Sequence, residues 1–131
     1  PTTIFDGAHN GAGAEALARS LRADTRGGMT VGVLSVLDDK DAEVMLNALG
    51  ACSDELIFTR ATHPRALDPA VLVAISERLG GPPCRVVEAP HDALAEARAA
   101  AGADGLAFAA GSLYLIADLK REPGSAGGST L

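Results

Sequence analysis

The chain has 131 residues, the usual size of one domain, and a domain of this length buries roughly 70% of the surface that its extended chain exposes. Hydrophobic residues make up 47% of the sequence and aromatic residues only 3%, so we expect a core of alanine, valine, leucine and isoleucine in closely packed helices and strands. The net charge of −6 excludes nucleic acid as the main partner, because neutralising a duplex needs a basic surface, but it allows a small anionic ligand.

Strands and helices alternate along the first half of the chain. Residues 2–5 predict a buried strand, and alanine and leucine then recur at the three- and four-residue spacing of a helix. Residues 30–37 predict a second buried strand, which is followed by another amphipathic helix, and residues 56–59 predict a third strand. Asp68, followed by proline, has the character of a capping residue and begins a third helix.

The same alternation continues in the second half. Residues 85–88 predict a fourth strand, and Pro90 opens an alanine-rich helix. Residues 106–109 predict a fifth strand. The apolar segment at 113–119 fits either a strand or a helix, because its leucines and isoleucine satisfy both patterns.

This order of elements predicts an α/β fold. Helical crossovers between strands give parallel pairing, so we expect a three-layer sandwich with a Rossmann-like, mostly parallel sheet of five to six strands and helices on both faces. Residues 1–122 are expected to form this domain, and the Gly- and Ser-rich residues 123–131 a flexible tail.

The sequence predicts a cytoplasmic protein. No apolar run approaches the roughly 20 residues that span a bilayer, and no charged and apolar leader precedes the first strand, so we expect no membrane partner. Cys52 and Cys84 are isolated and fit no metal-ligand spacing, so we expect reduced thiols and no metal site.

Polar residues follow four of the predicted strands. They occupy residues 6–10, 38–41, 60–65 and 111–112. In a parallel sheet these loops gather at one edge, which is where open α/β sheets bind their ligands. The first loop brings an acid, an imidazole and an amide to that edge, so it is the leading candidate for a site.

Three familiar motifs do not fit this chain. Gly7, Gly11 and Gly13 come in the wrong order for the dinucleotide fingerprint, and the sequence has no Gly-Lys-Ser/Thr phosphate loop. Ser112 lacks the Gly-x-Ser-x-Gly elbow of a hydrolase nucleophile. These readings are therefore disfavoured.

The Asp-Gly-Ala-His-Asn sequence at residues 6–10 resembles the motif that opens the C-terminal domain of the Mur ligase superfamily, in particular the folylpolyglutamate synthase and dihydrofolate synthase family. Further stretches match in the same order, at residues 32–34 with 39–41, at 64–67 and at 111–114. Gly11 departs from the pattern, because the family usually has proline there.

The resemblance implies a part of an ATP-dependent ligase that forms an amide. In that family a carboxylate of the folate or dihydropteroate substrate is phosphorylated to an acyl phosphate, which the amino group of glutamate attacks. The resemblance implies that ATP and Mg²⁺ are held largely by an upstream central domain absent from this chain. The present domain would close over ATP and help to bind glutamate, be inactive alone, and belong to an enzyme that is a monomer when intact.

The resemblance also implies roles for single residues. Asp6 matches an acid that contacts ATP, where the alternative is a turn or capping aspartate. His9 matches a histidine that orients the amine or acyl phosphate and binds glutamate, where the alternative is a helix cap. Ser112 matches a glutamate-binding serine, a role compatible with capping a helix. Lys40 and Arg65 are possible anion contacts, or else solvated surface cations.

Two alternatives to the folate ligase remain open. One is the C-terminal domain of a ligase that adds an amino acid to a muramyl nucleotide, and the other is a non-catalytic α/β binding module whose loop residues serve only as caps. We expect Asp39 and Asp41 to be helix caps, and His63 and His91 to be structural.

Overall fold

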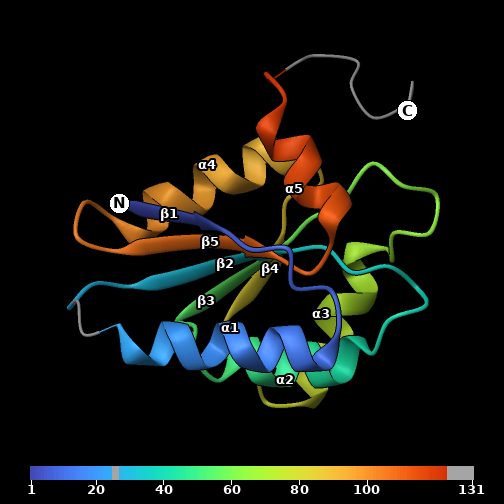
Figure 1. Cartoon of the computed structure of the whole chain (residues 1–131), viewed down its shortest axis with the longest axis horizontal. Coiled ribbons are helices and arrows are strands. Elements are labelled where there is room, and N and C mark those ends of the chain that lie inside the picture. The colour runs from blue at the N-terminus through green and yellow to red at the C-terminus, as the bar shows by residue number, and fades with distance from the viewer. Residues whose placement is uncertain (25–26, 124–131) are drawn as a thin grey trace.

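A parallel sheet lies between two layers of helices in the computed structural model, which describes residues 1–24 and 27–123 (Figure 1). The described residues form the strands β1 (Thr2–Phe5), β2 (Thr30–Leu34), β3 (Glu55–Phe58), β4 (Cys84–Val86) and β5 (Leu106–Ala110). They form the helices α1 (Gly11–Ala23), α2 (Ala42–Gly50), α3 (Pro69–Arg78), α4 (Pro90–Ala101) and α5 (Leu113–Lys120). The predicted α/β sandwich is therefore confirmed.

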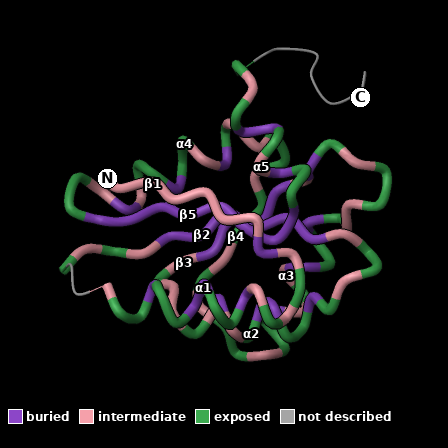
Figure 2. The backbone as a smooth tube through the Cα atoms, viewed as in Figure 1, coloured by how far each residue is buried: buried purple, intermediate pink, exposed green. Residues whose placement is uncertain are grey.

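The strand order of the sheet is β1-β5-β2-β3-β4, and every pair is parallel. The strand β5 pairs with β1 through Ile4 opposite Phe108 and with β2 through Gly32 opposite Phe108. The last strand in chain order, β5, thus lies between the first two, β1 and β2. Figure 2 shows the consequence, since burial is concentrated in β5, β2 and β3, whereas β1 and β4 are edge strands.

Two hydrophobic cores flank this sheet. On one face α1, α2 and α3 pack against residues that include Leu34, Phe58 and Phe108. On the other face α4 and α5 pack through alanines and leucines against Val31 and Ile57. Small alanine side chains let α4 lie close to the strands, which explains how a sequence with few aromatic residues fills its core.

Four polar residues begin helices as N-caps. The side chain of Asn10 accepts from the Gly13 N–H at 2.8 Å, and the equivalent bonds of the other caps begin α2, α3 and α5. The donors in these bonds are backbone N–H groups of the first helical turn, which have no partner within the helix itself. The predicted caps Asp41, Asp68 and Ser112 are confirmed, whereas Asp39 caps no helix.

Some element boundaries differ from the sequence prediction. The second strand ends at Leu34 rather than at residue 37, because the chain bends away and Leu37 forms an isolated antiparallel bridge with Ala66. The ambiguous segment after the fifth strand is a helix, α5. All of the expected tail except Pro123 lies outside the described residues. In the described part of the chain no helix is long and apolar enough to cross a membrane.

Candidate active-site pocket

The strand order creates a crevice at the carboxyl end of β5. The helices that follow β1 and β2 cover one face of the sheet, but α5, which follows β5, lies on the other face. The loops after these neighbouring strands therefore diverge, and such switch points are where open α/β sheets bind ligands. The first loop, which the sequence marks as the leading candidate, lies at this point.

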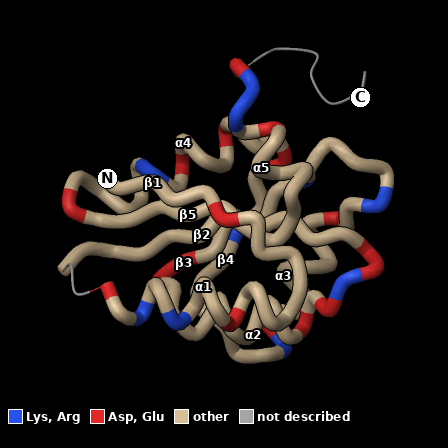
Figure 3. Tube along the Cα trace, in the orientation of Figure 1, with Lys and Arg blue, Asp and Glu red and all other residues tan. Residues whose placement is uncertain are grey.

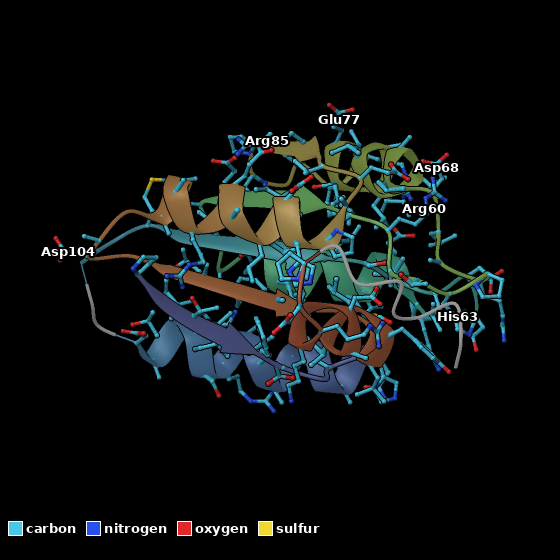
Figure 4. The ribbon with its side chains drawn as sticks, turned by 90° about the horizontal axis from the view of Figure 1, so that it is seen from above. Arg60, His63, Asp68, Glu77, Arg85 and Asp104 are labelled. Carbon is cyan, nitrogen blue, oxygen red and sulfur yellow. The ribbon has the colours of Figure 1, made fainter. Side chains whose placement is uncertain are left out.

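A pocket of about 310 Å³ opens at this crevice. Its lining comes from the loops after β1, β2, β3 and β5 and from the first turn of α5: His9, Leu37, Asp39, Lys40, His63, Arg65, Gly111, Ser112, Leu113 and Tyr114. Figure 4 shows His63 at the end of the sheet opposite Asp104, which lies at the amino ends of the strands. The prediction that four polar loops gather at one edge is confirmed.

Gly111 joins the loops that carry His9 and Ser112. Its N–H donates to the Ala8 carbonyl oxygen at 2.7 Å. Its φ is +104°, and a Cβ at this position would lie 2.3 Å from the carbonyl oxygen of Ser35. Both the backbone conformation and the close approach require glycine.

The first loop is held by its own side chains. Asp6 Oδ1 accepts from the Ala8 N–H at 2.8 Å, while Oδ2 makes no hydrogen bond within the described part of the chain. His9 Nδ1 lies 2.9 Å from the Gly7 carbonyl oxygen. Because a carbonyl only accepts, Nδ1 carries the proton, and Nε2 of the neutral ring is left as an acceptor.

Ser112 has two functions available to it. The residue is only 1% exposed, and its Oγ accepts from the Tyr114 N–H at 3.1 Å and the Leu115 N–H at 3.4 Å. These bonds use the hydroxyl oxygen as the N-cap of α5 and leave its proton to donate. A carboxylate at the mouth of the pocket would thus meet a hydroxyl donor beside the positive end of a helix.

Acidic residues accompany both cations of the pocket. Arg65 Nε lies 2.9 Å from Asp38 Oδ1, and Arg65 Nη2 lies 3.3 Å from Asp39 Oδ2. Lys40 Nζ is 3.8 Å from the same Asp39 oxygen. Figure 3 shows the resulting interleaved charges along the loop between β2 and α2. The hydrogen bond that Arg65 donates to Asp38 raises the pKa of the Arg65 guanidinium, which stays charged.

The structure brings together most of the residues that the sequence singles out. His9, Ser112, Lys40 and Arg65 line one pocket, whereas Asp6 lies in the same loop as His9 but outside the lining. Neither Lys40 nor Arg65 is a freely solvated cation, since each lies within ion-pair distance of an aspartate.

Sequence reasoning missed two aromatic residues of the pocket. The rings of His63 and Tyr114 have centroids 4.2 Å apart and an interplanar angle of 43°. His63 also accepts at Nδ1 from the Arg65 N–H at 3.1 Å. The available signal was the position of both residues a few positions after predicted strands, but their contact joins segments about 50 residues apart and has no local pattern.

No group of three or more His, Cys, Asp or Glu residues that could hold a metal ion occurs among the described residues. Asp39 in the pocket lining and Asp38 beside it are engaged with Arg65 and Lys40, and so the donor set does not fit a metal. The pocket instead offers cations, a hydroxyl donor and an imidazole acceptor, which suit an anionic ligand with an amine.

The chain belongs to the family described as "Mur ligase, glutamate ligase domain", whose model matches residues 1–113. Among curated proteins, the dihydrofolate synthase/folylpolyglutamate synthase of Mycobacterium tuberculosis is 44% identical over 95 residues, which are 72% of this chain and 20% of that protein. The chain thus spans about a fifth of the length of this relative.

Solved structures show the same fold. The Mycobacterium tuberculosis folylpolyglutamate synthase complexed with ADP and AMPPCP superposes with a TM-score of 0.79 and 38% identity, covering 94% of this chain and 30% of that one. The bifunctional folylpolyglutamate synthase/dihydrofolate synthase of Yersinia pestis, complexed with AMPPNP and a Mn ion, gives a TM-score of 0.76 and 25% identity, covering 87% and 26%.

Proposed function

We propose that residues 1–131 are the C-terminal domain of an ATP-dependent ligase that adds glutamate to the carboxylate of a folate or a dihydropteroate. The observation that carries this proposal is the single pocket shared by His9, Ser112, Lys40 and Arg65 in a chain of the Mur ligase family. The names of the relatives support the folate branch of that family.

In this proposal the pocket binds the incoming glutamate. Arg65 and Lys40 attract one carboxylate, and the Ser112 hydroxyl donates to the other at the start of α5. Asp39 makes longer, exposed contacts to both cations, and a carboxylate of the ligand can replace it at little cost. A substrate with two carboxylates and one amine satisfies all of these groups.

His9 acts on the amine. Amide formation joins the amine nitrogen to the acyl carbon, breaks the bond from that carbon to the phosphate oxygen, and releases a proton from nitrogen. With Nδ1 facing the Gly7 carbonyl, His9 directs Nε2 away from it, and an unprotonated Nε2 is able to accept a hydrogen bond from that amine. The Gly111 bond to Ala8 keeps this histidine beside Ser112, so amine and carboxylate are oriented together.

ATP supplies the phosphoryl group that activates the carboxylate of the folate or dihydropteroate as an acyl phosphate. Asp6 Oδ2 is available to accept from nucleotide hydroxyls, since only Oδ1 is engaged within its loop. The sequence has no phosphate loop and the described residues offer no metal-ligand group, so we infer that the triphosphate and Mg²⁺ are held outside residues 1–131. Residues 1–131 alone are then expected to release no ADP.

The test is a coupled ADP-release assay on the full-length protein that carries residues 1–131, supplied with ATP, Mg²⁺, glutamate and either dihydropteroate or a folate. We expect ADP release that requires both glutamate and the pterin substrate, with a product heavier by one glutamate residue. Release only with a muramyl nucleotide would favour the other branch of the superfamily. If no ADP is released with the pterin substrates or with a muramyl nucleotide, the result would favour a non-catalytic module and overturn the proposal.

A comparison of His9, in the pocket, with His91, outside it, tests the role of His9 and provides its control. His9→Ala should lower kcat/KM about a hundredfold, the usual scale for a positioned proton acceptor. His91 lies in the first turn of α4 and outside the pocket, and its Nε2 is buried with no hydrogen-bond partner in the described part of the chain. His91→Gln should leave turnover per folded molecule unchanged.

A further inference from the structure

A buried carboxylate in α5 holds one wall of the pocket from behind. Asp118 is 7% exposed, and its Oδ2 accepts from the backbone N–H of Thr62 at 2.7 Å. Thr62 belongs to the loop between β3 and α3, which carries His63 and Arg65 into the pocket. Asp118 itself does not line the pocket, and nothing in the local sequence marks it.

A continuous series of contacts joins Asp118 to Arg65. The Thr62 N–H donates to Asp118, and the ring of the next residue, His63, packs on Tyr114. His63 Nδ1 then accepts from the Arg65 N–H. The loop is therefore fixed to α5 at two levels. One is Tyr114 in the first turn of the helix, next to Ser112, and the other is Asp118, four residues further along, about 6 Å at the helical rise.

Packing alone does not explain an aspartate at this position. Burying a carboxylate is costly unless hydrogen bonds compensate it, and both oxygens of Asp118 are engaged, Oδ2 by Thr62 and Oδ1 by the Arg121 guanidinium. The short bond to Thr62 is charge-assisted, and such bonds are about twice as strong as neutral ones.

We propose that Asp118 is a positioning residue that sets where the β3–α3 loop presents Arg65 opposite Ser112. This inference rests on the proposed function, because it takes the pocket to be the glutamate site. Asp118 acts only through the loop, so its loss should weaken glutamate binding and leave ATP binding and the chemical step nearly unchanged.

The base of the loop has independent attachments. The Ala61 N–H donates to Ser35 Oγ at 2.9 Å, and the Leu67 N–H donates to the Val36 carbonyl oxygen at 2.9 Å. These bonds to the segment after β2 persist when Asp118 is changed. Its removal should therefore release the segment around Thr62 without detaching the whole loop.

The experiment measures KM for glutamate, KM for ATP and kcat in the full-length protein carrying Asp118→Ala, Asp118→Asn or Arg121→Gln. We expect Asp118→Ala to raise KM for glutamate about tenfold, with kcat and KM for ATP within about twofold of the parent. Asp118→Asn keeps a neutral acceptor for Thr62, so the rise should fall to about threefold. Arg121→Gln leaves the Thr62 bond in place and should not change KM for glutamate.

Each result decides the inference. A folded Asp118→Ala variant with unchanged KM for glutamate would overturn it, as would a loss of kcat that merely follows the folded fraction measured by thermal unfolding. If Asp118→Ala does not fold, the comparison of Asp118→Asn with the parent decides in the same way. The proposed function fails separately, when the parent protein itself shows no glutamate-dependent ADP release.

Discussion

The ring of Phe108 in β5 lies against Gly32 in β2, so that a Cβ at position 32 would lie 2.4 Å from the Phe108 Cζ atom. Phe108 is fully buried in one of the two hydrophobic cores. The strands β2 and β5, which end at the pocket, thus fit together because β2 has no side chain at residue 32, where β5 places the large ring of Phe108.

This contact predicts a strong response to a single methyl group. Gly32→Ala should lower the free energy of unfolding by about 2 to 3 kcal/mol, as expected for overpacking a rigid core. Phe108→Leu in the same chain should recover part of that loss, although it destabilises the parent. Urea unfolding of the two single variants and the double variant measures the coupling. Strictly additive effects would show that the ring and residue 32 do not compete for space.

The sequence predicts the layers of this fold better than the contacts within its site. Apolar runs of four to eight residues separated by helical spacing identify the strands, and parallel pairing then brings the strand-end loops to one edge. His9 and Ser112 can be placed in this way, because each lies in the segment between a strand and the helix that follows it. The residue types that cap helices identify Asp41 and Asp68 equally well.

Contacts between distant segments are not visible in the sequence. The aspartate triplet around Lys40 predicts only caps, yet Asp39 contacts Arg65 of another loop. Asp118 lies in an apolar segment and bonds a residue 56 positions away. The early end of β2 also depends on a partner elsewhere, since Leu37 pairs with Ala66. Such features depend on tertiary packing, which overrides local propensity.

Ser112 caps α5 and is proposed to bind glutamate, and the two roles can be separated. Ser112→Ala should lower the free energy of unfolding by about 1 kcal/mol, the usual cost of a lost cap, and should also raise KM for glutamate. Asp41→Ala removes the cap of α2, which accepts from the Val44 N–H at 3.2 Å outside the pocket. It should cost similar stability with KM unchanged. Denaturant unfolding and initial rates measure both effects, and equal KM changes in the two variants would contradict the binding role.

The thiols of Cys52 and Cys84 should make the free energy of unfolding depend on pH. Burial is the main cause that raises the pKa of both Cys52 and Cys84 in the folded chain. Below about pH 8.5, the ordinary cysteine pKa, both states keep the thiol proton. At higher pH the unfolded chain loses it first, so the free energy of unfolding should fall as pH rises through that range. Urea unfolding should show a smaller fall for Cys52→Ala, and an identical slope would exclude this cause.

Asp39 in the pocket lining and its neighbour Asp38 should have opposite effects on glutamate binding. Asp39 contacts both Arg65 and Lys40 where a ligand carboxylate is proposed to bind, so Asp39→Asn should lower KM for glutamate by about two- to threefold, the scale of an exposed ion pair. Asp38 holds the Nε side of Arg65, so Asp38→Asn should release the guanidinium and raise KM instead. Initial rates at low and high salt measure both, and the difference between the variants should shrink as salt screens the charges. Changes of the same sign in the two variants would show that only net charge matters, and that neither aspartate orients Arg65.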